Sequence, residues 1–269
     1  MRREVETEIN SARESIDLIL RRPDYVKNVI GLYAFSFYGI TRSRIMRASY
    51  LPVRKADDAL DGDAPRIKKP LIYVGNLRYN IAKNTLGKSP EEQLLRYSLD
   101  VLESKAKPKD DPRGDFVKSI DSIIFDYVRS SERRVLSAKE IEQYYRDAFD
   151  PVMNITLLAI DSNLRSGDIP SLSYGQGRVY SARHFKEDWE RGVLNVPGET
   201  ISSLDLSSQS PFEEVGGNPG ITDWFHQSLL NTKPDLLEAR SLLDRIGEKQ
   251  TQVVCNSLIS PMLKYIEAH

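Results

Sequence analysis

Hydrophobic positions recur along this chain mostly at intervals of three and four residues, and we find no convincing run of alternating polar and apolar positions. Intervals of three and four place side chains on one face of a helix, whereas a strand alternates with a period of two. The pattern therefore predicts an all-α bundle of roughly ten helices in a single domain spanning residues 1–269. Its first helix carries Ile9, Ile16 and Leu20 and is expected to end near Pro23.

Local signals predict where several helices begin. Pro70 opens one apolar segment, and Ser89 followed by Pro90 is typical of a helix N-terminus. Ser137 and Glu140 have the spacing of a capping box at the start of another helix. These signals fix the starts of three helices in the first two thirds of the chain.

Residues 198–220 are rich in Ser, Gly and Pro, which favours a long loop. We expect this loop to follow the segment 172–192 and to lie near the mouth of any cavity there. Two helices, over about residues 235–247 and 248–268, are expected to close the chain.

The charge balance is nearly neutral, with a formal net charge of −1 and a pI near 6.4. No basic field therefore favours nucleic acid as a partner. Cys255 is the single cysteine, which excludes an intramolecular disulfide and suits a reducing compartment. Residues 1–18 are charged and lack the apolar core of a signal peptide, so we expect a cytoplasmic protein.

An acidic cluster in the segment YLPVRKADDALDGD, residues 50–63, is the first candidate site. Tyr50, Arg54, Asp57 and Asp61 are spaced by four, three and four positions, so they share one helix face. Mg²⁺ usually binds one or two carboxylates, several waters and phosphate oxygens, and an arginine one turn away suits a diphosphate. A bare pair of aspartates at this spacing is more often simply solvated, so a second feature is needed.

That second feature lies in GRVYSARHFKEDWERGVLNVP, from Gly177. Tyr180, His184, Asp188 and Arg191 step by four, four and three, which predicts a second helix with a polar face. Two such faces across a bundle cavity would form a site for one large polyanion and its metal ions.

Other site classes fit less well. An EF-hand loop starting at Asp57 would have Ala59 and Lys68 at ligand positions, which excludes it. The three histidines, His184, His226 and His269, have no spacing typical of a zinc site.

The same segments resemble the squalene and phytoene synthase family. YLPVRKADDALDGD is similar to its first aspartate-rich helix, and the preceding SFYGITRSR, from Ser36, resembles the segment that leads into it. IDSIIFDYVRS is similar to the middle helix of the family, with Asp126 at an acidic position. EDWERGVLNVP resembles the closing signature, so the four matches follow the family's order over about residues 30–200.

The second acidic motif departs from the family pattern. Gly177, Tyr180 and His184 stand where the family has glutamine, asparagine and aspartate, whereas Asp188 keeps the expected identity. Val193 stands where an arginine is expected. His184 would ligate a metal, pair with a diphosphate when protonated, or bond a neighbour such as Asp188; in each case the second metal site is expected to be weaker.

The resemblance implies an isoprenoid-synthase-like fold with a central cavity and Mg²⁺-dependent ionisation of an allylic prenyl diphosphate. It also implies roles for particular residues of this chain. The implied catalytic residues are Tyr50, Asp57, Asp61 and His184, and the implied metal ligands are Asp57, Asp58, Asp61, Glu187 and Asp188. The implied substrate contacts are Ser36, Phe37, Tyr38, Arg54, Tyr180, Arg183 and Arg191.

Three functions remain open from the sequence. Head-to-head condensation of two prenyl diphosphates is the expected one, and it normally uses both acidic motifs. Because the second motif is altered, the alternatives are transfer of one prenyl group to an aromatic acceptor, or terpene cyclisation. A non-catalytic assembly factor of the same family is the third. Chain length, use of NADPH and peripheral membrane contact are left open.

Overall fold

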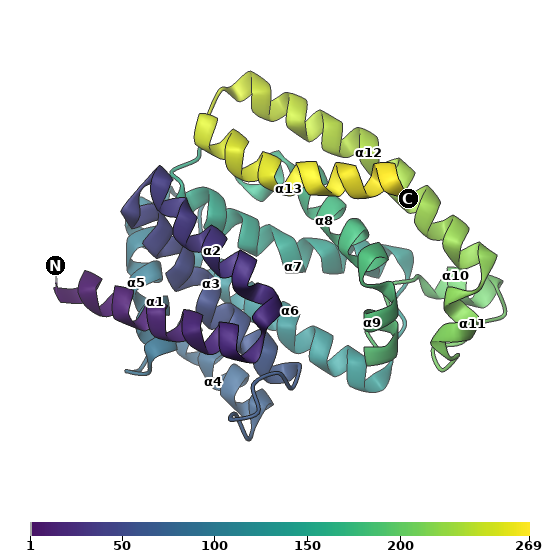
Figure 1. Cartoon of the computed structure of the whole chain (residues 1–269), viewed down its shortest axis with the longest axis horizontal. Coiled ribbons are helices and arrows are strands. Elements are labelled where there is room, and N and C mark those ends of the chain that lie inside the picture. Colours follow the sequence, from purple (N-terminus) through teal and green to yellow (C-terminus); the bar gives the residue numbers. More distant parts are fainter. Residues whose placement is uncertain (1) are drawn as a thin grey trace. The chain divides into compact units, whose positions relative to one another are not determined.

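A computed structural model describes residues 2–269, and all regular secondary structure in this range is helical. It comprises thirteen α-helices and three short 3-10 helices (η) within the described residues, with no strand among them (Figure 1). The all-α prediction is therefore confirmed. No helix in the range 2–269 combines the length and apolarity that crossing a bilayer requires.

Packing divides the chain into two compact units. The first runs to Ile124 and includes Asn154–Asn163, and the second comprises Phe125–Met153 and Leu164–His269. Two of the three boundaries fall inside α6 (Pro112–Glu132) and α7 (Ala138–Ala159), so each of these helices contributes to both units, and the third follows Asn163, after the end of α7. The single domain proposed from the sequence stays a prediction.

The first unit is built around α3. α3 spans Ile40–Leu60, and the other elements are α1 (Arg2–Arg21), η1 (Pro23–Tyr25), α2 (Val26–Ala34), η2 (Phe35–Tyr38), α4 (Pro70–Lys83) and α5 (Pro90–Lys105). α3 packs against α1, α4 and α5. The predicted starts at Pro70 and Pro90 are confirmed, and the Ser89 hydroxyl accepts a bond from the Glu92 N–H as an N-cap.

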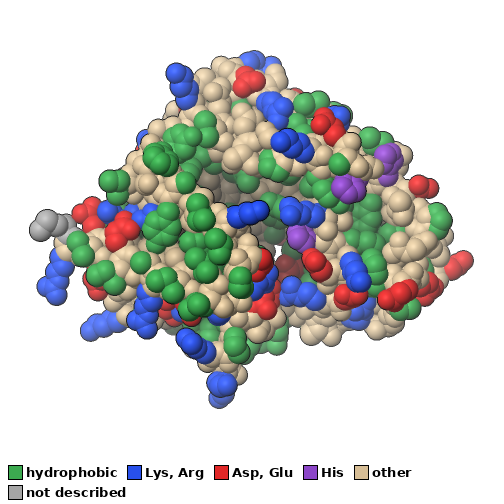
Figure 2. Space-filling view, viewed as in Figure 1, with side chains coloured by type: hydrophobic (Ala, Val, Ile, Leu, Met, Phe, Trp, Pro, Cys, Tyr) green, Lys and Arg blue, Asp and Glu red, His purple; other side chains and the backbone are tan. Residues whose placement is uncertain are grey.

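α1 buries its polar face and exposes its apolar one. Glu14 is buried and accepts a bond from Lys55 of α3 at 2.9 Å, and Glu8 pairs with Arg47 at 2.6 Å. Ile9 and other apolar residues of α1 face solvent, and Figure 2 shows hydrophobic side chains over α1 and α2. The predicted helix is present and ends before Pro23, but ion pairs determine which face packs inward.

The second unit has its core around α8, α12 and α13. Its elements are η3 (Ser166–Asp168), α8 (Pro170–Arg183), α9 (Phe185–Arg191), α10 (Gly198–Ser203), α11 (Phe212–Gly216), α12 (Pro219–Ile246) and α13 (Lys249–Ala268). α12 packs against both α8 and α13. Trp189 of α9 is buried in a separate cluster with residues of α10, α11 and α12.

The long loop predicted at residues 198–220 is wrong. The segment holds α10 and α11, and α12 already starts at Pro219. Ile201, Val215 and Ile221 are buried in the Trp189 cluster, and Asn218 caps α12 by accepting a bond from the Gly220 N–H at 2.9 Å. The prolines and glycines of this segment therefore separate short helices, each of which has an apolar anchor.

Candidate functional site

The C-terminal end of α3 carries Asp57 and Asp61, two aspartates predicted from the sequence to bind a cation. Asp57 lies on the helix and Asp61 caps its end, where the Asp61 N–H donates to the Asp57 carbonyl at 2.9 Å. This bond continues the helical pattern, so the two side chains lie one turn apart on the same side. The Asp57 side chain is 34% exposed and Asp61 is also exposed, so solvent reaches both carboxylates.

Arg54 lies one turn before Asp57 and pairs with two aspartates. Its Nη1 is 2.6 Å from Asp57 Oδ2, and its Nη2 is 2.5 Å from Asp58 Oδ1. Its guanidinium also lies 4.4 Å from the ring centre of Tyr25. Burial opposes the charge on Arg54, but the two carboxylates outweigh burial and raise its pKa. Arg54 is therefore a fixed, permanently charged group beside Asp57.

Asp58, which the resemblance implies as a metal ligand, is enclosed by protein. Its side chain is fully buried and pairs with Arg21 of α1 as well as with Arg54. Two guanidinium groups thus contact one buried carboxylate, and its removal would take from both cations their only fully buried partner, leaving Arg21 with Asp17 and Arg54 with Asp57. We assign Asp58 a structural role that ties α1 to α3, and keep Asp57 and Asp61 as the candidate ligands.

The remaining predicted residues of the first unit differ in burial. Burial raises the pKa of the Tyr50 hydroxyl to about 12, against the opposing effect of a hydrogen bond with Asn28. Ser36, Phe37 and Tyr38 lie in η2, where Phe37 is 92% exposed and Tyr38 is also exposed. Tyr50 is therefore placed to donate a hydrogen bond rather than to act as a base at neutral pH.

The polar face predicted on one helix at residues 180–191 is divided between two helices. α8 ends at Arg183, His184 lies at the junction, and α9 begins at Phe185. The His184 N–H donates to the Tyr180 carbonyl and the Asp188 N–H donates to the His184 carbonyl, both at 2.9 Å. The helical hydrogen-bond spacing therefore continues through the junction, although the backbone of His184 departs from helical geometry.

His184 bonds to Glu187, another predicted ligand. Its Nδ1 lies 2.8 Å from Glu187 Oε2, and both side chains are exposed. The Tyr180 ring lies between Phe149, whose ring centre is 6.0 Å away, and His184, at 6.4 Å. Arg183 and Arg191, the predicted substrate-binding arginines, are exposed.

Close packing requires glycine at position 177 of α8. A Cβ atom added to Gly177 would lie 2.1 Å from the ring of Tyr145, which is itself buried. The Tyr145 hydroxyl lies 2.8 Å from Ser181 Oγ on α8. Since the Tyr145 ring occupies this space, a side chain at position 177 has no room unless that ring moves.

Sequence reasoning missed a buried network around Arg129 in the second unit. Arg129 is 1% exposed; its Nε donates to Asp126 at 2.8 Å and its Nη2 to Asn195 at 2.7 Å. Asn195 Nδ2 donates to Asp188 Oδ2 at 3.1 Å, and the Tyr144 hydroxyl donates to Asp126 at 2.7 Å. The network links α6, α7 and α9 to the chain that follows α9.

A close approach at the end of α9 brings Asn195 to this network. Gly192 has a φ of +86°, and a Cβ at this position would lie 2.3 Å from the Ser130 carbonyl oxygen of α6. Only glycine combines this backbone conformation with such a contact. Gly192 thus allows the chain to turn after α9, and Asn195, three residues further on, accepts a bond from Arg129.

Asp188 should make the stability of the protein depend on pH. Burial, reinforced by Asp126, raises its pKa to about 6, against the opposing effects of His184, Asn195 and Arg129. Since an unfolded aspartate titrates near pH 3.9, the folded state binds more protons between about pH 4 and pH 6. Stability contributed by this group is therefore lost as pH rises through that window.

We expect Asp188→Asn to remove this dependence. The free energy of unfolding of the variant, relative to the native protein, should rise by up to roughly 1.4 kcal/mol per pH unit between about pH 4 and pH 6 and then level off. Urea unfolding at a series of pH values measures the difference. Parallel pH profiles for the two proteins would contradict the assignment.

The predicted metal ligands fall in different units, with Asp57 and Asp61 in the first and Glu187 and Asp188 in the second. Among residues 2–269, no three His, Cys, Asp or Glu side chains are grouped so that they could hold a metal ion. A two-carboxylate site for Mg²⁺ needs fewer protein ligands, because waters and phosphates supply the others. A search of known protein families and curated proteins finds no match to this chain.

Proposed function

We propose that the protein is a Mg²⁺-dependent prenyltransferase that ionises an allylic prenyl diphosphate and joins it head-to-head to a second one. The observation that supports this proposal is the arrangement of charges at the end of α3. Asp57 and Asp61 are one turn apart and reached by solvent, and the charged Arg54 pairs with Asp57. One face thus combines carboxylates for a cation with a guanidinium for a phosphate oxygen.

The donor chemistry of this face fits magnesium. Both groups are carboxylates, which hard cations prefer, and Mg²⁺ commonly binds proteins through one or two carboxylates together with substrate phosphates. When bound, the ion would neutralise the diphosphate and so make it a better leaving group.

The side chains around this face have separate tasks in the proposed reaction. Arg54 donates charge-assisted hydrogen bonds to a diphosphate oxygen, while Asp58 and Tyr25 hold the guanidinium in place. Tyr50 keeps its proton because its pKa is about 12, so it acts as a hydrogen-bond donor. Asp57 would hold the cation in place of its pairing with Arg54, and the guanidinium would then be available to the substrate.

The second unit favours a second candidate, transfer of one prenyl group to a non-diphosphate acceptor or cyclisation. Asp188 is bonded within the buried network of Arg129, and His184 is bonded to Glu187. A second metal-diphosphate complex would have to break these contacts. A reaction with one diphosphate requires only the face on α3.

Product analysis distinguishes head-to-head condensation from prenyl transfer to an acceptor or cyclisation. The protein is incubated with Mg²⁺ and prenyl diphosphates of several chain lengths, with and without aromatic acceptors, and pyrophosphate and organic products are measured. A dimeric hydrocarbon or a cyclopropyl diphosphate supports condensation, and a product formed only with an acceptor, or a cyclised product, supports the second candidate. Absence of pyrophosphate under all these conditions would overturn both and favour a non-catalytic role.

A further inference from the structure

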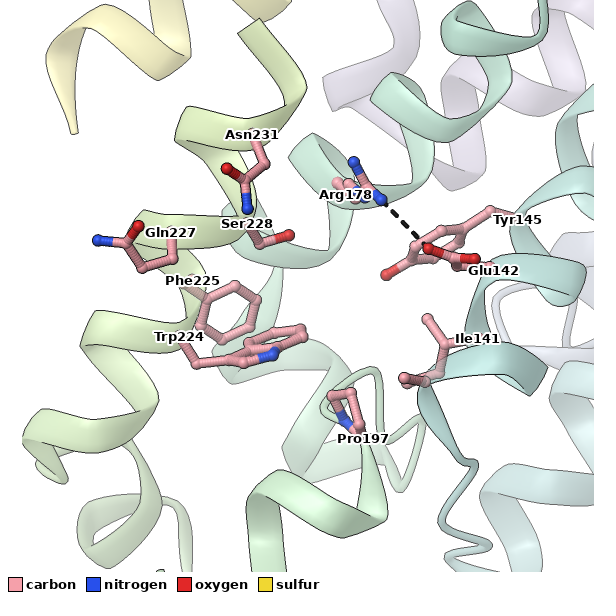
Figure 3. A pocket seen from close by; sticks show the side chains of 11 residues that line it. Ile141, Glu142, Tyr145, Arg178, Pro197, Trp224, Phe225, Gln227, Ser228 and Asn231 are labelled. Carbon is pink, nitrogen blue, oxygen red and sulfur yellow. Dashed lines mark hydrogen bonds and ion pairs between the residues drawn. The ribbon is translucent and has the colours of Figure 1, made fainter. Parts of the chain in front are cut away.

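A cavity in the second unit lies apart from all the predicted site residues. It has a volume of about 280 Å³ and is lined by residues of α7, α8 and α12 together with Pro197 (Figure 3). Ligand pockets usually enclose about 300 Å³ or more, so this one suits only a small molecule. Its lining is mixed, with an apolar part and a polar part.

One face of α12 lines the cavity, and its side chains change from apolar to polar along the helix. Trp224, Ser228 and Asn231 are spaced by four and three positions and all line the cavity. Ile141 and Pro197 lie on the apolar side with the Trp224 indole, whereas Arg178 of α8 lies near the polar end (Figure 3). A ligand that fills this space needs a flat apolar body and one polar end.

Arg178 makes only long contacts with its polar protein partners, and its guanidinium lies 5.9 Å from the ring centre of Tyr174. Its nitrogens lie 3.3 Å from Glu142 Oε1, 3.3 Å from Thr232 Oγ1 and 4.0 Å from Asp235 Oδ2. Charge-assisted bonds between nitrogen and a carboxylate are normally about 2.7–2.9 Å long. For comparison, Arg78 holds Asp121 at 2.6 and 2.9 Å elsewhere in the chain.

The Arg178 side chain is 23% exposed, whereas its acidic partners Glu142 and Asp235 are about half exposed and lie 3.3 Å and 4.0 Å away. Ser228 and Asn231 beside it have no side-chain hydrogen bond to any other described residue. A carboxylate at this end would accept short bonds from the guanidinium and further bonds from the hydroxyl and the amide. Glu142 and Asp235 already offset part of the charge, which favours a singly charged ligand over a doubly charged phosphate.

We propose that this cavity binds a small aromatic monocarboxylate, with its ring against Trp224 and its carboxylate on Arg178. An aromatic ring packs favourably against an indole, and a planar carboxylate can accept two parallel hydrogen bonds from a guanidinium. This site is independent of the activity proposed for α3, since none of the predicted prenyl-diphosphate residues lines it.

Binding of indole-3-carboxylate, with indole and phenyl phosphate as comparison probes, tests the proposal by NMR titration. The two tryptophans of the chain provide an internal control. The Trp224 indole N–H signal should shift, while that of Trp189, which is buried and donates to the Ser210 carbonyl at 2.9 Å, should not. The carboxylate should bind at least about 10-fold more tightly than neutral indole.

Three variants locate the binding determinant. Arg178→Gln should weaken carboxylate binding at least about 10-fold, and Glu142→Gln should tighten it about threefold, because a competing carboxylate is removed. Arg146→Gln is the matched control, since Arg146 also stacks on Tyr174, at 4.7 Å, but does not line the cavity. A folded Arg178→Gln variant that binds as well as the native protein, tighter binding of phenyl phosphate, or no shift of Trp224 with any probe would overturn the proposal.

Discussion

Replacement of Asp57 by alanine should abolish pyrophosphate release while the protein stays folded. The variant loses one of the two carboxylates that we assign to the cation, and loss of a single charge-stabilising group at a reacting centre typically costs about 10²–10³ in rate. The fold should survive because Asp57 is partly exposed, and Arg54 keeps its bond to the buried Asp58. The initial rate of pyrophosphate release and the Mg²⁺ binding isotherm are both measured, and both should be lost.

Asp63→Ala is the matched control for Asp57→Ala. Asp63 lies two residues beyond Asp61, past the end of α3, and pairs with Arg22. The Asp63→Ala substitution removes one negative charge from the same region but leaves the proposed cation site intact. Its activity should therefore stay within about twofold of the native rate. Full activity in Asp57→Ala, or equal losses in both variants, would show that the metal assignment on α3 is wrong.

Local sequence signals predicted helix starts well because each depends on residues within one turn. The Ser137 capping box is present: the Glu140 N–H donates to the Ser137 hydroxyl at 3.3 Å, and the Ser137 N–H donates to the Glu140 carboxylate at 2.8 Å. The same holds for Asp57 and Asp61, whose spacing alone places them on one side of α3. Prediction failed where a distant partner decides the outcome: the pairing of Glu8 with Arg47, 39 residues away, turns the polar face of α1 inward.

The buried network of the second unit illustrates the same limit. Asp126 and Arg129 are three residues apart on α6, a spacing that the sequence displays. Nothing local indicates that Arg129 bonds Asn195, which is 66 positions away. Segment composition also gave a wrong prediction at residues 198–220, because Pro and Gly favour turns whereas three buried aliphatic residues there anchor short helices.

Asp58 and Asp57 are neighbours that share Arg54, yet their replacement should have very different consequences. Asp58→Asn leaves Arg21 and Arg54 buried without their common counter-charge, and breaking a buried ion pair in this way typically costs about 3–5 kcal/mol. Asp57→Asn removes a partly exposed partner, for which about 1 kcal/mol or less is expected. The free energy of unfolding, measured by urea titration, should therefore fall several-fold more in Asp58→Asn.

Unfolding of Asp58→Asn and of the native protein in EDTA distinguishes a structural role of Asp58 from a role as a metal ligand. A metal ligand contributes to stability only through bound ion, so chelation would make the Asp58→Asn variant as stable as the native protein or more so. A structural carboxylate contributes through Arg21 and Arg54 whether or not metal is present. We expect Asp58→Asn to be less stable than the native protein by the same amount with and without EDTA, with a lower thermal midpoint. Equal stability of the variant and the native protein in EDTA would make Asp58 a candidate magnesium ligand again.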